Sequence, residues 1–435
     1  MLPGRPDMSA NSRRTVLTGL GVLSPIGSKL STFWAAALAG TCGVRPIQLL
    51  DVSSLPCRIG GEILDYDPKL FVPAINKDGR KSLKNMARTV HLGVCAAQLA
   101  MDDGGPQKGQ IDPFRFGIEF GCVMVATDID DIACATKLSV AATPGTIDLK
   151  AWGNVGIESV PPNWMLKYLP NMSACHTSIF FDAQGPNNTI TEADASGILA
   201  LAEAYRIMNR GLADFFLVGG TESKINPVSY ARHSTFTPFT KKNDSPATAI
   251  RPFDLHRDGI AFGEAAAAVG LEDLDFARNR GAKIYAEVVG VAAGFDKGMK
   301  GKILARIIRN ALAEAGIAPS EVDHVNSHAG GSPYLDAFEA RAIHEVFGGA
   351  VPVYALKGQT GNTGAAAGIL ELIVSAMALH EGKLPGTINY TTPDPECPVN
   401  VHVGEPRPVT KPYAVKISYT DMGQCAVAVL RRYDG

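Results

Sequence analysis

Apolar runs alternate with helix-like periodicity along most of the chain. Continuous apolar stretches at residues 116–125 and 213–223 predict buried strands. Apolar positions with a helical period predict four helices, over residues 88–101, 197–209, 302–315 and 338–347. Strands that alternate with helices in this way are typical of an α/β fold with a largely parallel, buried sheet.

The N-terminal stretch "RRTVLTGLGVLSPIG" predicts a short strand at residues 15–18 and a glycine-rich turn at residues 19–27. The turn contains Gly-x-Gly but lacks the third glycine at dinucleotide spacing, so we expect no nucleotide cofactor. A second strand-like run begins after "ARNRGA", near residue 283. We therefore expect a loose tail at residues 1–12 and two halves, at residues 13–273 and 274–435.

The two halves share a short internal similarity. "ASGILALAEA" from Ala195 resembles "AAGILELIVS" from Ala366, and each segment opens a helix with small residues after a turn. A duplicated α/β unit explains two such segments at similar depths in two halves of similar length. We expect the two helix starts to face each other across a pseudo-twofold axis, so that a site built from both is plausible.

Composition and charge exclude several functional classes. A net charge of −2 gives no support to nucleic-acid binding, which requires a basic face. The eight cysteines are scattered and contain no C-x-x-C pair, which argues against a disulfide scaffold or a metal site and fits a reducing cytoplasm. No run of about 18 apolar residues is present, so we expect no membrane span.

Candidate chemistry gathers where strands run into helices. The turn in "TITEADASGILALAEAY" carries Glu192 and Asp194 at a helix N-terminus, which favours an anion. His328 lies on a glycine-rich turn beyond a strand, and Lys357 lies at the end of the next strand. This repeated placement at strand ends predicts a shared site for a polarised carbonyl or a carboxylate. Two acids, three residues apart on one helix face, accompany it: Asp336 and Glu339.

Seven motifs resemble one known family over residues 13–432. They are "VLTGLGVLSPIG", "PNMSACHTSIFFDAQGPNNTIT", "ADFFLVGGTES", "RPFDLHRDGIAFGE", "NSHAGGSPYLDAFEA", "LKGQTGNTGAAAG" and "VKISYTDMGQCAV". They are similar to the β-ketoacyl-acyl-carrier-protein synthases of type II fatty-acid and polyketide synthesis, in the thiolase superfamily. The resemblance implies a thiolase-like fold, with two duplicated α/β halves in five layers, and dimerisation through residues 120–205.

The resemblance also implies site residues, several of which depart from the family pattern. Asp194 stands where the family has its acyl-accepting cysteine, and Asn362 stands at the second active-site histidine. The first histidine and the lysine are kept as His328 and Lys357, with Asp336 and Glu339 as supporting acids. Asp421 replaces a phenylalanine that gates the acyl pocket.

These departures predict the loss of condensation. Condensation requires a thiolate as nucleophile and leaving group, whereas a carboxylate would form an easily hydrolysed anhydride. Asn362 still offers one amide donor, but Asp421 adds negative charge where an apolar chain and an oxyanion should lie. If Asp194 is charged, we expect the helix end and Lys357 to stabilise it. Because Asp194 and Asp421 would repel each other, we expect at least one of them to be paired with Lys357 or His328, or to be protonated. The sequence leaves open whether it is a structural plug or a catalytic group.

Three functions remain compatible with this pattern. The first is a non-condensing partner of an active ketosynthase, like a chain-length factor, although those proteins typically carry glutamine at the position of Asp194. The second is an enzyme with altered chemistry on acyl thioesters (decarboxylation, hydrolysis or acyl transfer) that uses Asp194, His328 and Lys357. The third is a homodimeric protein that has kept only carrier binding.

A basic run near residue 80 has two readings. The default is a solvated helix face, and the family resemblance implies contact with an acidic acyl carrier protein. The residues concerned are Lys77, Arg80, Lys81, Lys84 and Arg88. The expected partners are thus an acyl carrier protein and a second chain, which is either a ketosynthase or another copy.

Overall fold

Two five-stranded units with the same strand order form the core of the protein. The computed structural model describes residues 13–66, 82–143 and 145–435, so the expected tail at residues 1–12 lies outside the described residues. The first unit has the order β1-β7-β6-β4-β5. Its strands are β1 (Thr15–Leu23), β4 (Phe116–Cys122), β5 (Asn187–Ile190), β6 (Phe215–Ser223) and β7 (Glu264–Asp273).

The second unit repeats this topology with the order β8-β15-β14-β9-β10. Its strands are β8 (Ala286–Phe295), β9 (Val322–Asn326), β10 (Pro352–Tyr354), β14 (Tyr413–Tyr419) and β15 (Gln424–Arg432). The pairing is also the same when the five strands of each unit are counted in chain order. The fifth strand is antiparallel to both of its neighbours, the first and the fourth strands. The fourth, second and third strands follow in that order and are parallel to one another. The predicted duplication is therefore confirmed.

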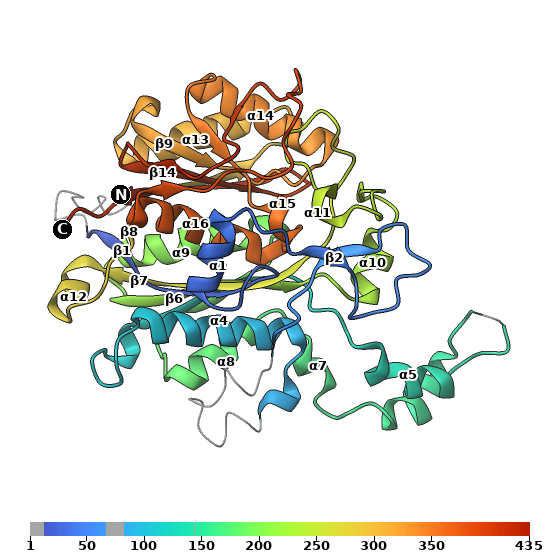
Figure 1. The fold of residues 1–435 in the computed structure, drawn as a ribbon. Coiled ribbons are helices and arrows are strands. Elements are labelled where there is room, and N and C mark those ends of the chain that lie inside the picture. Colours follow the sequence, from blue (N-terminus) through green and yellow to red (C-terminus); the bar gives the residue numbers. More distant parts are fainter. Residues whose placement is uncertain (1–12, 67–81, 144) are drawn as a thin grey trace, which may run out of the picture.

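The two units are joined where β1 pairs with β8, and helices separate and cover them in five layers (Figure 1). Helices α9 (Ser196–Asn209) and α16 (Ala367–Glu381) form the middle layer. One outer layer holds α13 (Lys302–Ala315) and α14 (Pro333–Phe347), and the other holds α4 (Arg88–Gly104) and α8 (Met172–Phe181). This is the thiolase-like arrangement that the resemblance implied.

Shorter elements complete the described chain. The helices are α1 (Leu30–Leu38), α5 (Ile129–Leu138), α6 (Leu149–Ala151), α7 (Trp164–Lys167), α10 (Pro227–His233), α11 (Pro246–Ala249), α12 (Leu274–Asn279) and α15 (Lys357–Thr360). The strands are β2 (Val44–Pro46), β3 (Ile59–Gly61), β11 (Lys383–Leu384), β12 (Asn400–Val401) and β13 (Arg407–Pro408).

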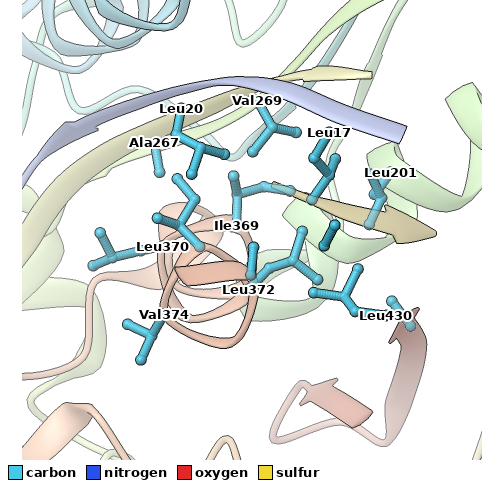
Figure 2. Close-up of a cluster of buried hydrophobic side chains, with 14 of the residues drawn as sticks. Leu17, Leu20, Leu201, Ala267, Val269, Ile369, Leu370, Leu372, Val374 and Leu430 are labelled. Atoms are coloured by element: carbon cyan, nitrogen blue, oxygen red, sulfur yellow. The ribbon is translucent and has the colours of Figure 1, made fainter. Parts of the chain in front are cut away.

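Helix α16 is the central core element, and its side chains are buried nearly all round. Figure 2 shows Leu370 and Leu372 of this helix among side chains from β1, β7 and β15, such as Leu17, Val269 and Leu430. In the part of the chain that the structure describes, one segment is long and apolar enough to cross a membrane, Gly364–Glu381, and 89% of it is buried inside the protein. A helix apolar on all sides is expected in the core of a large protein, and this one is the core helix.

The starts of α9 and α16 touch each other through glycines. A Cβ added to Gly197 would lie 2.9 Å from the Ala365 carbonyl oxygen, and one added to Gly368 would lie 2.9 Å from Ile198 Cγ1. Each helix therefore has a glycine where it contacts the start of the other helix. Such a reciprocal contact is expected at a pseudo-twofold axis. This contact brings the two preceding turns together.

The predicted glycine-rich turn at residues 19–27 is wrong in its first part, because β1 continues to Leu23. A Cβ on Gly19 would lie 2.2 Å from the Ala100 carbonyl oxygen, and one on Gly21 would lie 2.0 Å from that of Ala96. The glycines therefore allow α4 to lie directly on the strand. Close packing, rather than a turn, explains them.

Glu119 on β4 is a buried carboxyl group that should make the stability of the protein depend on pH. Its side chain is fully buried, and neither oxygen has a hydrogen-bond partner among the described residues. Burial, with a smaller effect of Glu203, raises its pKa to about 8. A raised folded-state pKa means that stability is lost as the pH rises from the unfolded value, about 4.3, to about 8.

Glu119→Gln is therefore expected to raise the thermal midpoint relative to the native protein, by a margin that grows from pH 5 to pH 8 and is constant above pH 8. Glutamine keeps the shape of the side chain and cannot ionise. Calorimetric scans of both proteins between pH 5 and pH 9 test this. A margin that does not change with pH would show that Glu119 does not titrate in this range.

Candidate functional site

Asp194 lies on a strained turn at the start of α9. The preceding residue, Ala193, has a φ of 43°, in the left-handed region that side chains rarely adopt. Ser196 Oγ fastens this turn by accepting the Glu192 N–H at 2.8 Å and donating to the Ala193 carbonyl at 2.7 Å. In the second unit Gly364, with a φ of 60°, opens the corresponding turn before α16. The geometry presents the Asp194 side chain to the cavity described below.

Both carboxylate oxygens of Asp194 accept hydrogen bonds. Lys224 Nζ donates to Oδ1 at 2.8 Å and Asn362 Nδ2 donates to Oδ2 at 2.8 Å, and His328 Nε2 lies 3.6 Å from Oδ2. Only 15% of the Asp194 side chain is exposed. Burial alone would raise the pKa of this carboxyl, but the Lys224 charge and the His328 ring outweigh it and hold the pKa well below its usual range. Asp194 is thus an ionised and bonded carboxylate.

Lys224 is the main functional residue that sequence reasoning missed. It follows directly after β6, and its side chain is 8% exposed and lies over the Phe262 ring at 5.4 Å. A Cβ on Gly364 would lie 1.8 Å from Glu222 Oε2 and 2.5 Å from Lys224 Cε, so that glycine makes room for both the buried Glu222 carboxylate and the lysine. Its position after a strand end, the signal that singled out His328 and Lys357, could have revealed it.

Of the two partners expected for Asp194, His328 lies beside it, at 3.6 Å, but Lys357 does not bind it, because the ammonium group of Lys357 is bound elsewhere. Lys357 Nζ makes three hydrogen bonds at 2.8 Å, to His328 Nδ1, to the His328 carbonyl oxygen and to Glu371 Oε1. Since an ammonium group has no acceptor, the bond to Nδ1 places the proton of a neutral His328 ring on Nε2, the atom that faces Asp194. Lys357 therefore orients the histidine.

A third buried lysine, Lys416, completes a chain of polar contacts through the site. Lys416 Nζ lies 2.5 Å from Glu371 Oε2, and Glu371 is shared by Lys357 and Lys416. Burial lowers the pKa of Lys416 to about 8, and the two lysines hold the pKa of Glu371 well below its usual range despite burial. The chain runs from Lys224 and Asp194 through His328 to these three residues.

The supporting acids hold the loop that carries His328. Asp336 accepts backbone N–H groups from four residues and makes no contact with Asp194; the donors are Phe253, Gly330, Gly331 and Ser332. Glu339 accepts the His328 N–H at 2.7 Å and the Tyr419 hydroxyl at 3.2 Å. Burial raises the pKa of both carboxyl groups, that of Glu339 to about 7. Both act on the position of His328.

All five candidates predicted in the pocket line one cavity of about 90 Å³. Asp421 is exposed on the turn between β14 and β15, and Asp194, Asn362, His328 and Lys357 lie below it. This volume holds about three water molecules, against roughly 300–1,000 Å³ for most small-molecule sites. Among the residues that the structure describes, no group of three or more His, Cys, Asp or Glu residues has the arrangement of a metal site. The cavity is small, and its charged side chains share the lining with apolar ones such as Phe236, Ile260 and Phe262.

The basic run is described only in part, and neither of its described residues, Lys84 and Arg88, lines this cavity. Three of its residues lie outside the described residues: Lys77, Arg80 and Lys81. Lys84 is exposed. Arg88 binds the buried carboxylate of Glu264 through two hydrogen bonds of 2.6 and 2.7 Å, so its guanidinium group is already engaged. Contact with a carrier protein stays a prediction for the run.

Comparisons with known proteins identify the family and support the fold. The model "Beta-ketoacyl synthase, N-terminal domain" matches residues 12–277, and "Beta-ketoacyl synthase, C-terminal domain" matches residues 285–391. A 3-oxoacyl-[acyl-carrier-protein] synthase 2 of Synechocystis sp. is 34% identical, with 97% of this chain and 98% of the relative covered. The same enzyme of Staphylococcus aureus is 31% identical, with 98% and 100% covered.

Two solved structures are also similar over the whole chain. The ishigamide ketosynthase/chain length factor has a TM-score of 0.85 at 28% identity, with 97% of this chain and 100% of that chain covered. A type II polyketide synthase acyl-carrier protein in complex with its ketosynthase has a TM-score of 0.81 at 26% identity, with 98% and 100% covered.

Proposed function

The chain belongs to the β-ketoacyl synthase family, and we propose that it is a non-condensing member that acts as the partner subunit of an active ketosynthase in fatty-acid or polyketide synthesis. The observation that carries this proposal is the bonding of Asp194. Its two oxygens are bound by Lys224 and Asn362, and its pKa lies well below the usual range. Such a carboxylate is a weak base and a weak nucleophile, so it serves as a plug.

Two further features support the absence of condensation. Asn362 uses one of its two amide N–H donors on Asp194, so that this donor is not free for an enolate oxygen. Asp421 places a second carboxylate at the cavity. Loss of one oxyanion donor typically costs about 10²–10³ in rate. Loss of the nucleophile as well leaves no route to an acyl-enzyme.

The proposed contact with a second chain lies in residues 120–205. Strand β5 is an edge strand that pairs only with β4 within the described residues. The segment around α5 projects from the layered body, and α7 lies between that segment and α8 (Figure 1). They carry exposed apolar side chains, which in a soluble chain favour burial against a partner: Met124, Ile129, Leu138, Val140, Leu149, Val155, Ile157, Met165 and Leu166.

Other expectations accompany this proposal. An acyl carrier protein is the proposed second partner, with exposed Lys84 among the contacts. The eight free cysteines fit a cytoplasmic location. The proposed boundary between the halves, after residue 273, falls between β7 and β8, at the start of α12.

Co-expression with a ketosynthase that keeps its cysteine tests the partner function. We expect the purified protein alone to form no acyl-enzyme and no β-ketoacyl product, and the co-purified pair to form product. Intact mass spectrometry and product analysis give both readouts. Asp194→Asn is the matched variant, because it keeps the shape and an acceptor for Lys224 but removes the charge. A pair with this variant should keep its activity within about twofold.

The altered enzyme remains the rival function, and the same experiment separates the two. Exposed Asp421 is the cavity carboxylate left for general acid–base work, because Asp194 is bonded on both oxygens. Release of CO2 or free acid from malonyl-carrier by the isolated protein, abolished in Asp194→Asn or in Asp421→Asn, would overturn the partner proposal. If the protein forms a homodimer that binds the carrier protein but no ketosynthase, the third function, a protein that has kept only carrier binding, would be supported instead.

A further inference from the structure

Three hydrogen-bond donors from three different elements converge on the Asp194 carboxylate. Lys224 follows β6, Asn362 precedes α16, and His328 follows β9. Their distances to the carboxylate oxygens are 2.8, 2.8 and 3.6 Å. The same donors would face any carboxylate held at this point, whether or not it is attached to residue 194.

We propose that Lys224, Asn362 and His328 form a carboxylate-binding site whose built-in ligand is Asp194, and that a small free monocarboxylate binds there when the Asp194 side chain is shortened. The inference goes beyond the proposed function, because it depends on the donors and not on a partner chain. It assigns to Lys224 the role of recognising the anion.

Each donor is held in position by contacts that do not involve Asp194. Lys224 packs over Phe262 in the space left by Gly364. The Asn362 amide is oriented because its Oδ1 accepts the Gly364 N–H at 3.0 Å, which turns Nδ2 towards the carboxylate. Lys357 fixes the His328 ring as described above. The site should therefore survive the loss of its ligand.

The native protein should not respond to free carboxylates. Its own carboxylate is tethered beside the donors, and a tethered group has an effective concentration that a millimolar solute does not match. Asp194 also repels a second anion. The native chain is thus the control for non-specific effects of the salts.

Two shortened variants give a size-matched test. Asp194→Gly removes a group with the atoms of acetate, and Asp194→Ala removes only the carboxylate, a group with the size of formate. We expect sodium acetate and sodium formate to raise the thermal midpoint of Asp194→Gly, but formate to act more strongly than acetate on Asp194→Ala, whose methyl group fills part of the site. Ligand linkage predicts a saturating rise on the order of 1–3 °C above equal sodium chloride.

Removal of the lysine is the decisive control. Asp194→Gly combined with Lys224→Met should lose the response to both carboxylates, whereas Asp194→Gly combined with Lys108→Met, which changes an exposed lysine outside the cavity lining, should keep it. If either shortened variant is recovered in soluble form only from formate or acetate buffer and not from chloride, that also supports the site. Equal responses in chloride, in the native protein or without Lys224 would overturn the proposal, as would insolubility of both variants in every salt.

Discussion

Lys224→Met is expected to lower the free energy of unfolding by about 3–5 kcal/mol, the usual cost of breaking a buried ion pair from one side. Asp194 would then keep only the Asn362 amide, at 2.8 Å, and the more distant His328 Nε2 atom, at 3.6 Å, in a site where 15% of its side chain is exposed. Methionine has a similar length and keeps the packing against Phe262. Urea unfolding of both proteins at pH 7 measures the difference.

A matched double variant separates charge from packing. Asp194→Asn with Lys224→Met removes both charges, so it should be more stable than Lys224→Met alone. The pH dependence has a defined sign. The folded-state pKa of Asp194 is depressed, so its stabilising effect is present above the unfolded value, about 3.9, and is lost as the pH falls below it. The difference in free energy of unfolding between the native protein and Lys224→Met should therefore decrease as the pH falls below about 3.9. A difference that stays constant down to pH 3 would contradict the ion pair.

The architecture was largely predictable because it depends on patterns that lie within single segments. The apolar period of residues 302–315 matches α13 at both ends, since one face of that helix is buried and the other is solvated. The similarity at Ala195 and Ala366 marked the duplicated unit. Gly19 and Gly21 were misread as a turn. They are needed because the backbone of α4, about 80 residues away in the sequence, lies directly against them, and a local sequence pattern does not reveal such a contact.

The sequence predicted several residues that line the site, but not which of them form hydrogen bonds with one another. Strand ends placed His328 and Lys357 beside Asp194, and the structure does gather them. The identity of the cation that binds Asp194 depends on side-chain direction: Lys357 turns to Glu371, and Lys224 takes its place. Gly364 is part of the reason, because its missing side chain opens the space for Lys224. Such a pairing between residues 30 positions apart, on two separate turns, leaves no periodic signal.

Asp194→Cys is expected to create an unusually reactive thiolate that still does not condense. The new thiol would lie beside the Lys224 ammonium group, the Asn362 amide and the N-terminus of α9, all of which favour the anion. In such surroundings thiol pKa values fall to about 3.5–7.5, from about 8.5 for a free cysteine. At pH 6.5 we expect alkylation by iodoacetamide to be roughly tenfold faster at residue 194 than at exposed Cys134, because the larger thiolate fraction outweighs the lower intrinsic nucleophilicity.

The pH profile of this alkylation, followed peptide by peptide by mass spectrometry, identifies the cause. Adding Lys224→Met to Asp194→Cys should move the midpoint of the profile upwards, since the cation that stabilises the thiolate is gone. Acyl transfer from an acyl-carrier thioester to the introduced thiol should become detectable as a mass shift, because nucleophile and elbow are then both present. Condensation with malonyl-carrier should stay absent, because Asp421 still places a carboxylate at the cavity and the second histidine is still replaced by Asn362. A β-ketoacyl product from this single variant would show that Asp194 alone blocks the chemistry, and an alkylation midpoint near the free-cysteine value, about 8.5, would show that Lys224 does not act on residue 194.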